Sequence, residues 1–282
     1  MRPEHVAMMK ARARNIALKV AYDGTNYHGF QRQTPPIRAV QNVLEAALAQ
    51  VCGETVELAS AGRTDAGVHA YGQVVNFFTD GRIPTERLPR AVNGLLPPDI
   101  VVSEAWEAAR DFSARHSATG KAYVYRMKEC RVPDPFTRSY AWQIFQPLDY
   151  DAMRAALHLL EGTHDYSSFR AAGGAPMSPV RTLDTIRLTA EGEGRLSLYI
   201  HGTSFLYHMV RNIVSTAVAV GTGRISKDRF AEIFAARDRR LAPPTAPAGG
   251  LYLLAVDYDG TSERSHTDGA GNAAASCDKC RT

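Results

Sequence analysis

The chain has 282 residues, of which 45% are hydrophobic and 22% are charged, and its formal net charge is +4. This balance is typical of a globular protein, and no apolar run is long enough to cross a bilayer, which excludes a membrane-spanning protein. The positive charge is compatible with a polyanionic partner, because bound phosphates release counterions, but charge alone does not indicate nucleic-acid binding.

The first 106 residues alternate between strand-like and helix-like hydrophobic patterns. Turn signals follow the first strand, and a pair of prolines follows the second helix. The order βαββαβ is that of a ferredoxin-like unit, in which helices cover one face of an antiparallel sheet. The expected strands are residues 16–22, 56–61, 72–78 and 100–106, and the expected helices are residues 40–51 and 85–96.

The rest of the chain predicts the same order of elements a second time, with an extra strand at 141–145 and an extra helix at 227–236. The expected strands are residues 121–128, 182–188, 195–201 and 251–258, and the expected helices are residues 150–160 and 205–220. We therefore predict an α+β fold in which two ferredoxin-like halves form a mixed, mostly antiparallel central sheet flanked by helices and loops.

The predicted domain boundaries follow from these elements. The N-terminal half spans 15–110 and the C-terminal half spans 111–260. A flexible lead at 1–14 precedes them, and a tail at 261–282, polar and rich in small residues, is expected to be disordered.

The cysteines and the N-terminus suggest a reducing compartment. Residues 1–10 lack the apolar stretch of a secretory signal, and the four cysteines have no disulfide-framework spacing, so we expect a cytoplasmic protein without bridges. Cys277, Cys280 and His266 could suggest zinc, but a second pair of ligands is missing, and we expect no metal.

Two loops carry candidate functional residues. Residues 62–67 form a tight, glycine-bounded loop between strands with Asp65 near its tip, which fits either a plain surface turn or a functional loop on a rigid sheet. Residues 22–32 are dense in aromatic, glycine and polar residues, a composition that suits base stacking and equally suits a hairpin-like connection.

Two further candidates lie on regular elements. Tyr123 and Tyr125 are two apart on one strand and share a face, where core packing is the ordinary explanation. On the helix expected at 205–220, the apolar residues form one arc, and periodicity predicts that Arg211, opposite this arc, faces solvent. Phosphate-binding glycine signatures, paired metal-binding acids and a Ser-His-Asp arrangement are absent at persuasive spacing.

Several ordered blocks together resemble the TruA family of tRNA pseudouridine synthases, and the resemblance runs from about residue 16 to residue 258. The blocks are Ala21-Tyr22-Asp23-Gly24-Thr25, Gly29-Phe30-Gln31, residues 62–70, Phe112-Ser113-Ala114-Arg115, residues 168–172, residues 178–182 and residues 205–214. Several multi-residue blocks in order are far more specific than any single motif.

The resemblance implies roles for individual residues. Asp65 corresponds to the family's catalytic aspartate, Arg63 to an arginine that holds the uridine out of the RNA stack, and Arg211 to the basic partner of the aspartate. Tyr123 corresponds to the tyrosine that packs on the base, and it is also implied to assist proton removal at C5. The further residues expected to contact substrate are His69, Gln31, Arg170 and Phe205.

The same resemblance implies an activity. The family converts uridine to pseudouridine at positions 38, 39 and 40 of the tRNA anticodon stem-loop, using an aspartate nucleophile and a flipped base, without cofactor or metal, as a homodimer. Whether the aspartate attacks the base or the sugar, or promotes a glycal route, stays open. The alternatives are a non-catalytic RNA-binding or RNA-folding protein and, as a distant third, a metal-dependent nuclease.

Overall fold

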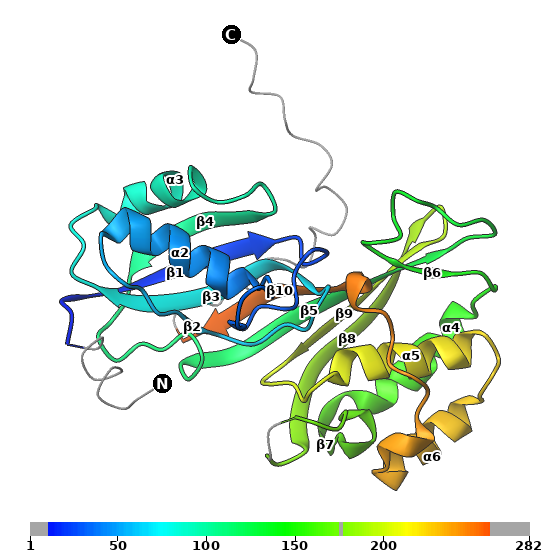
Figure 1. The fold of residues 1–282 in the computed structure, drawn as a ribbon. Helices are drawn as coiled ribbons and strands as arrows, with labels where there is room; N and C mark the ends of the chain where they lie inside the picture. The colour runs from blue at the N-terminus through cyan, green and yellow to red at the C-terminus, as the bar shows by residue number, and fades with distance from the viewer. Residues whose placement is uncertain (1–10, 175–176, 260–282) are drawn as a thin grey trace.

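The computed structural model describes residues 11–174 and 177–259, and in this part of the chain ten strands form one sheet (Figure 1). The strands are β1 (Arg14–Tyr22), β2 (Ala59–Ser60), β3 (His69–Thr79), β4 (Ile100–Glu107), β5 (Ala118–Glu129), β6 (Trp142–Ile144), β7 (Gly162–Asp165), β8 (Val180–Gly192), β9 (Arg195–Gly202) and β10 (Leu251–Tyr258). The α-helices are α2 (Val40–Cys52), α3 (Leu88–Asn93), α4 (Tyr150–Leu157), α5 (Met209–Gly221) and α6 (Lys227–Ala236).

The strand order confirms the predicted α+β fold. The sheet runs β4-β1-β3-β10-β5-β9-β8-β7, with β2 beside β3 and β6 beside β5. Numbered within each unit, both β4-β1-β3-β2 and β10-β5-β9-β8 have the order 4-1-3-2, which is the ferredoxin-like arrangement. The division of the chain into domains at residue 110 stays a prediction.

The two ferredoxin-like units meet where β3 and β10 pair. This pairing is parallel and involves two positions, Tyr252 with His69 and Leu253 with Ala70. On its other side β10 pairs with β5 along most of its length, so that Leu253 lies opposite Tyr123. The junction therefore places the start of β3, directly after the Asp65 loop, beside the middle of the sheet.

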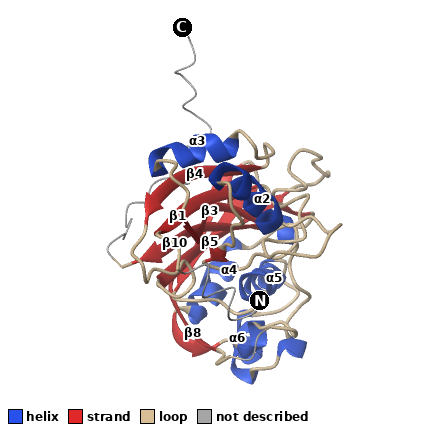
Figure 2. Ribbon diagram, turned by 60° about the vertical axis from the view of Figure 1, so that its left-hand side comes forward, coloured by secondary structure: helices blue, strands red, loops and turns tan. Residues whose placement is uncertain are grey.

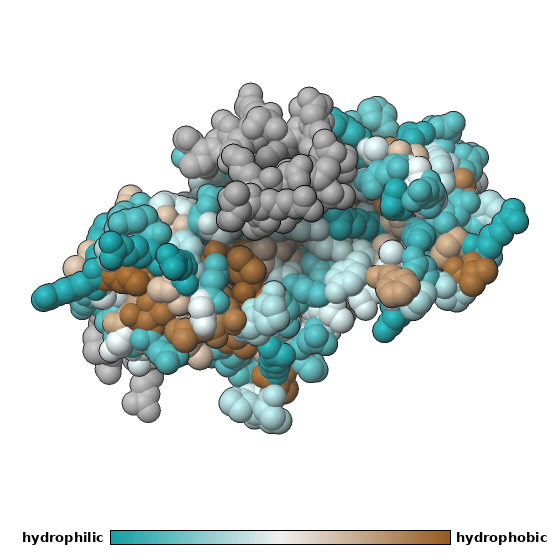
Figure 3. All heavy atoms as spheres, turned by 90° about the horizontal axis from the view of Figure 1, so that it is seen from above, coloured by the Kyte–Doolittle hydropathy of each residue, from teal (hydrophilic) through white to brown (hydrophobic). Residues whose placement is uncertain are grey.

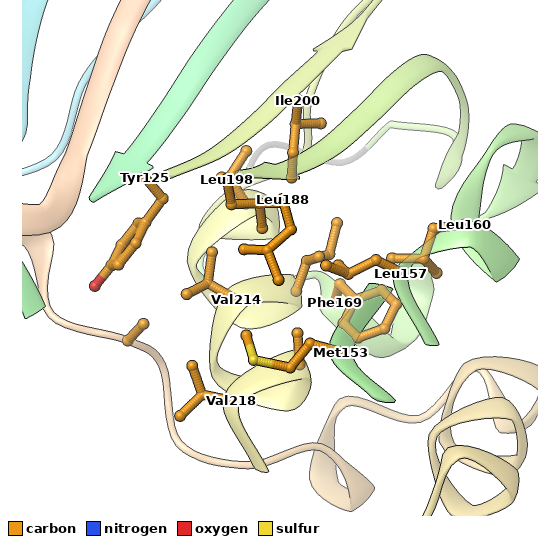
Figure 4. Packing of buried hydrophobic residues seen from close by; sticks show 14 of the residues in the cluster. Tyr125, Met153, Leu157, Leu160, Phe169, Leu188, Leu198, Ile200, Val214 and Val218 are labelled. Carbon is orange, nitrogen blue, oxygen red and sulfur yellow. The ribbon is translucent and has the colours of Figure 1, made fainter. Parts of the chain in front are cut away.

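Helices cover one face of this sheet, and two apolar clusters form the core between them. One cluster packs α2 and α3 on β1 and β3, and the other packs α4, α5 and α6 on β5, β8 and β9 (Figures 2 and 4). Tyr123 packs against both clusters. The core thus continues across the junction, with Tyr123 on the helix-covered face between the two halves.

Several elements differ from the sequence prediction in length, and three differ in kind or in where they begin. The strand expected at 56–61 is reduced to β2, because Leu58 bonds side chains of α2 through its backbone: its N–H donates to Glu45 and its carbonyl accepts from Gln41. The helix expected from residue 205 begins at Met209, after His208 in the left-handed conformation. Strand β7 is polar and was not expected.

The surface seen from above is divided. Apolar residues gather over the left-hand side, where the N-terminal unit lies in Figure 1, and hydrophilic residues dominate the right (Figure 3). Within the described residues no helix has the length and apolar character needed to span a membrane. The predicted tail at 261–282 and most of the lead at 1–14 lie outside the described residues.

We expect Leu253→Ala to lower the free energy of unfolding by about 2–5 kcal/mol, because Leu253 is fully buried on β10 in the core of the N-terminal unit. Its neighbour Leu254 is only partly buried, so Leu254→Ala should cost less than about 1 kcal/mol. Urea unfolding of both variants checks this. Equal losses would show that the junction does not depend on the core side of β10.

Candidate active site

The loop that carries Asp65 lies between β2 and β3 and is held by the second loop predicted from the sequence. Phe30 donates its backbone N–H to the carbonyl of Thr64 at 3.1 Å, and the N–H of Gly67 donates to Tyr27 at 3.3 Å. The hydroxyl groups of Tyr22 and Thr64 hydrogen-bond at 2.7 Å beneath the loop. Loop 22–32 is therefore a brace for the Asp65 loop.

Gly29 permits this close contact. Its φ of 87° lies in the left-handed region, and a Cβ at this position would lie 2.6 Å from the carbonyl oxygen of Thr64. Both the backbone conformation and the space require a residue without a side chain.

The start of the Asp65 loop is anchored by buried donors from the sheet. Lys121 on β5 donates to the carbonyl of Ala61 at 2.7 Å, and Gln73 on β3 donates to the carbonyl of Gly62 at 2.8 Å. Burial, with a smaller contribution from the charge of Arg115, lowers the pKa of Lys121 to about 8. These bonds satisfy loop carbonyls that would otherwise lack partners near the core.

Asp65 is joined to the beginning of α5. Its Oδ2 accepts a hydrogen bond from Arg211 Nη1 at 3.1 Å and lies 3.2 Å from His208 Nε2. Burial of the carboxyl raises its pKa, but His208 and then Arg211 oppose burial strongly enough that the pKa of Asp65 is lowered overall. Asp65 is therefore ionised at neutral pH although only 26% of its side chain is exposed.

Arg211 does not face solvent, which corrects the expectation from helical periodicity. Its side chain is 13% exposed, and its Nε donates to the carbonyl of Ala246 at 2.8 Å. Helix α5 is buried on nearly all sides, so an apolar arc does not define an exposed opposite face. The connection at 242–250 runs along the side of α5 that carries Arg211, and it provides the carbonyl that accepts the hydrogen bond from the guanidinium.

Two aromatic rings lie beside the carboxylate. Tyr123 and Phe205 make an edge-to-face contact with ring centroids 4.8 Å apart. Burial raises the pKa of Tyr123, and the charges of Tyr22 and Asp65 raise it further, so its hydroxyl is protonated at neutral pH. The pair provides an apolar wall with one polar group next to an ionised acid.

Three further predicted site residues, Arg63, Gln31 and Arg170, differ in solvent exposure and in their contacts. Arg63 is exposed, and within the described residues no hydrogen bond or ion pair engages its guanidinium. Gln31 is half-buried in the bracing loop, next to Phe30. Arg170 donates to the carbonyl of Met177 at 3.2 Å, and its neighbour Ala171 bonds the backbone of Tyr207, so it lies near the segment before α5.

The contact of His69 with substrate stays a prediction. Its side chain is 2% exposed, and its Nδ1 accepts from the N–H of Gly24 at 3.1 Å. Its Nε2 bonds the carbonyls of Ser139 and Gly249, and its ring stacks on Tyr252. Its place is in the scaffold that joins the loop to β10.

His208 is a site residue that the sequence interpretation missed. It lies within the block at 205–214, three residues before Arg211, and this spacing places both side chains on one side of a helix start. This spacing could have indicated His208 as a site residue from the sequence alone. The left-handed backbone that directs the ring toward Asp65 was not visible in the sequence.

The described residues contain no group of three or more His, Cys, Asp or Glu side chains that could hold a metal ion. The suggested zinc ligands Cys277, Cys280 and His266 lie outside the described residues. Cys52 and Cys130 are free thiols.

An ionised carboxylate, a largely buried guanidinium and two aromatic rings therefore lie together where the two units meet. Comparison with known sequences then identifies the family. The sequence model of a family described as tRNA pseudouridine synthase matches residues 18–117 and 156–259. The chain belongs to this family, whose members are isomerases.

Curated relatives agree over nearly their whole length. A protein named tRNA pseudouridine synthase A from Thermoanaerobacter sp. is 44% identical over 87% of this chain and 100% of its own length. Proteins of the same name from Myxococcus xanthus and Neisseria gonorrhoeae are 44% and 43% identical and are covered over 94% and 95% of their lengths, with 89% and 90% of this chain. A solved archaeal box H/ACA sRNP Nop10-Cbf5 complex aligns at a TM-score of 0.35 and 12% identity, over 78% of this chain and 47% of that chain.

We expect Gly29→Ala to lower the free energy of unfolding by about 3 kcal/mol or more, since a left-handed backbone and a contact with Thr64 both penalise a Cβ. The control is Gly53→Ala, whose φ of 71° is equally left-handed but whose added Cβ meets nothing within 4 Å. Strain alone should cost the control about 1–2 kcal/mol. Urea unfolding measures both losses, and similar values would mean that the close approach to Thr64 is unimportant.

Proposed function

We propose that this protein isomerises uridine to pseudouridine at positions 38, 39 and 40 of the tRNA anticodon stem-loop, with Asp65 as the nucleophile and the target base flipped out of the stack. The observation that carries the proposal is the Asp65–Arg211 ion pair, in which both side chains are largely buried. A nucleophilic carboxylate must stay ionised where water is partly excluded, and a fixed guanidinium provides this.

The two aromatic rings fit the proposed substrate, a uridine whose base has left the RNA stack. Pseudouridine formation breaks the glycosidic bond at N1, turns the base and rejoins the sugar at C5, so the base must first leave the RNA stack. Tyr123 and Phe205 offer ring faces and edges on which an extruded uracil can pack. Because Tyr123 is neutral, we assign it packing on the base, and any proton removal from C5 requires that substrate binding lowers its pKa.

Arg63 fits the role of holding the flipped nucleotide. It is two residues from Asp65, exposed, and without a recorded partner among the described residues. An arginine with a free planar fork can bond a phosphate or stack where the base was removed. Gln31 and Arg170, on neighbouring segments, are proposed to contact the RNA beside it.

The tRNA partner, the anticodon positions and the homodimer come to this chain from its family resemblance. A tRNA that reaches both a catalytic cleft and a second protomer would make many phosphate contacts, in keeping with the net charge of +4. The alternative, a protein that only binds or folds RNA on this surface, is disfavoured by an ionised and largely buried acid held by a guanidinium.

We expect Asp65→Asn to bind unmodified tRNA with near wild-type affinity and to form pseudouridine at a rate lower by on the order of 10³-fold or more, as for loss of other nucleophiles. Chemical mapping of pseudouridine on tRNAs with uridine at only one of positions 38, 39 or 40 gives the rate at each position. No product with wild-type protein would leave the RNA-binding alternative. Turnover by Asp65→Asn would remove Asp65 from the chemistry.

We expect Arg63→Ala to lower kcat more than it raises KM, because its guanidinium is proposed to stabilise the flipped state rather than the bound tRNA. Removing one such charged contact should cost about 10²-fold in kcat. Arg82→Ala removes an arginine placed just before the predicted second helix and serves as a charge-matched control. Steady-state kinetics with a full-length tRNA distinguishes the two effects, and an equal change in both variants would indicate only lost net charge.

A further inference from the structure

We infer that His208 is a positioning residue that, together with Arg211, holds Oδ2 of Asp65 and thereby leaves Oδ1 as the oxygen that reacts. The inference rests on the proposed function, because it assigns parts within a site where Asp65 is the nucleophile. It assigns a role to His208, and it gives the two carboxylate oxygens different roles: Oδ2 is held in place and Oδ1 reacts.

The contacts of the carboxylate are one-sided. Arg211 Nη1 and His208 Nε2 lie 3.1 Å and 3.2 Å from the same oxygen, Oδ2. Within residues 11–174 and 177–259, no donor hydrogen-bonds Oδ1. Two donors at one oxygen fix the rotation of the carboxylate about its Cβ–Cγ bond, so that the other oxygen has a defined direction.

The backbone of His208 is shaped for this contact. His208 is the N-cap of α5, with φ 58° and ψ 10°, which is the left-handed conformation that non-glycine residues rarely adopt. An N-cap side chain usually accepts a hydrogen bond from the first turn of its helix, but His208 makes no such bond. His208 therefore has a strained backbone conformation, and its side chain does not cap the helix. Backbone strain of this kind is often found at functional sites.

Neighbouring groups hold the imidazole in place. The ring stacks on Tyr207 with centroids 3.9 Å apart and planes 29° apart. The carbonyl of Tyr207 accepts from the N–H of Ala171 at 3.0 Å, and Gly174 packs so closely on Tyr207 that an added Cβ would lie 2.9 Å away. Tyr207 therefore covers one face of the ring, while Nε2 at the ring's edge lies 3.2 Å from the carboxylate.

His208 and Arg211 act on the carboxyl in the same direction. Burial raises the pKa of Asp65, and the hydrogen bond and charge of His208, followed by those of Arg211, lower it overall. The titratable or charged side chains facing Asp65 are His208 and Arg211 at the start of α5 and Tyr123 on β5.

The test uses single-turnover rates of pseudouridine formation, tRNA dissociation constants and urea unfolding on the full chain. His208→Phe keeps a ring for stacking but removes the donor, and His208→Gln restores a donor close to the position of Nε2. His208→Gly suits the left-handed backbone and should fold at least as readily as the other variants. The control for a histidine-to-phenylalanine change is His158→Phe, at an exposed position.

We expect His208→Phe and His208→Gly to lose about 100-fold in single-turnover rate with tRNA affinity unchanged, the usual effect of removing one preorganised donor. His208→Gln should regain most of the rate. When the single-turnover rate is plotted against pH, the fall in rate at acid pH should move to higher pH in His208→Phe, because loss of a donor raises the pKa of Asp65. In His208→Gln this fall in rate should move less.

Full rate in His208→Phe would overturn the inference, and so would a rate loss that only follows weakened tRNA binding or unfolding. A wild-type protein that forms no pseudouridine would instead refute the proposed function, so the two failures are distinguishable.

Discussion

The ion pair between Asp65 and Arg211 is the interaction on which the rest of the site depends. It joins residues 146 positions apart, one from a loop of the N-terminal unit and one from a helix of the C-terminal unit. Neither unit contains the site alone. The pairing of β3 with β10 at two positions, and the core that continues through Leu253 and Tyr123, fix the distance between the two units and thereby the geometry of the ion pair.

A strained backbone and close packing also occur beside this pair. Gly29 lets two loops touch, and His208 holds a left-handed backbone at the start of α5. His69 links the Asp65 loop to the segments at Ser139 and Gly249 through its Nε2. Such local costs persist because surrounding hydrogen bonds and packing overdetermine the conformation. A rigid scaffold behind a loop is what allows a single carboxylate to be held in one orientation.

Much of the fold could be predicted from the sequence, because hydrophobic periodicity reports directly on strands and amphipathic helices. Helix α6 agrees with its prediction at both ends, and the two 4-1-3-2 units follow from element order. Periodicity failed for Arg211, since a helix buried on all sides has no solvent face, and for residues 56–58, whose backbone bonds α2 instead of a strand. Site geometry was less accessible: motif resemblance pointed to Asp65, Tyr123 and Arg211, but side-chain direction at His208 and His69 depends on backbone conformation and on distant contacts.

The residues around Asp65 must satisfy two opposed demands on one carboxylate. Donors that keep Asp65 ionised also withdraw electron density and weaken it as a nucleophile, whereas burial without donors would favour the neutral acid. The structure separates these demands in space. Both donors act at Oδ2, where they lower the pKa and fix the rotation, while Oδ1 keeps its lone pairs unengaged by the described residues. The carboxylate that stays charged at neutral pH therefore also keeps one oxygen that no donor among the described residues engages.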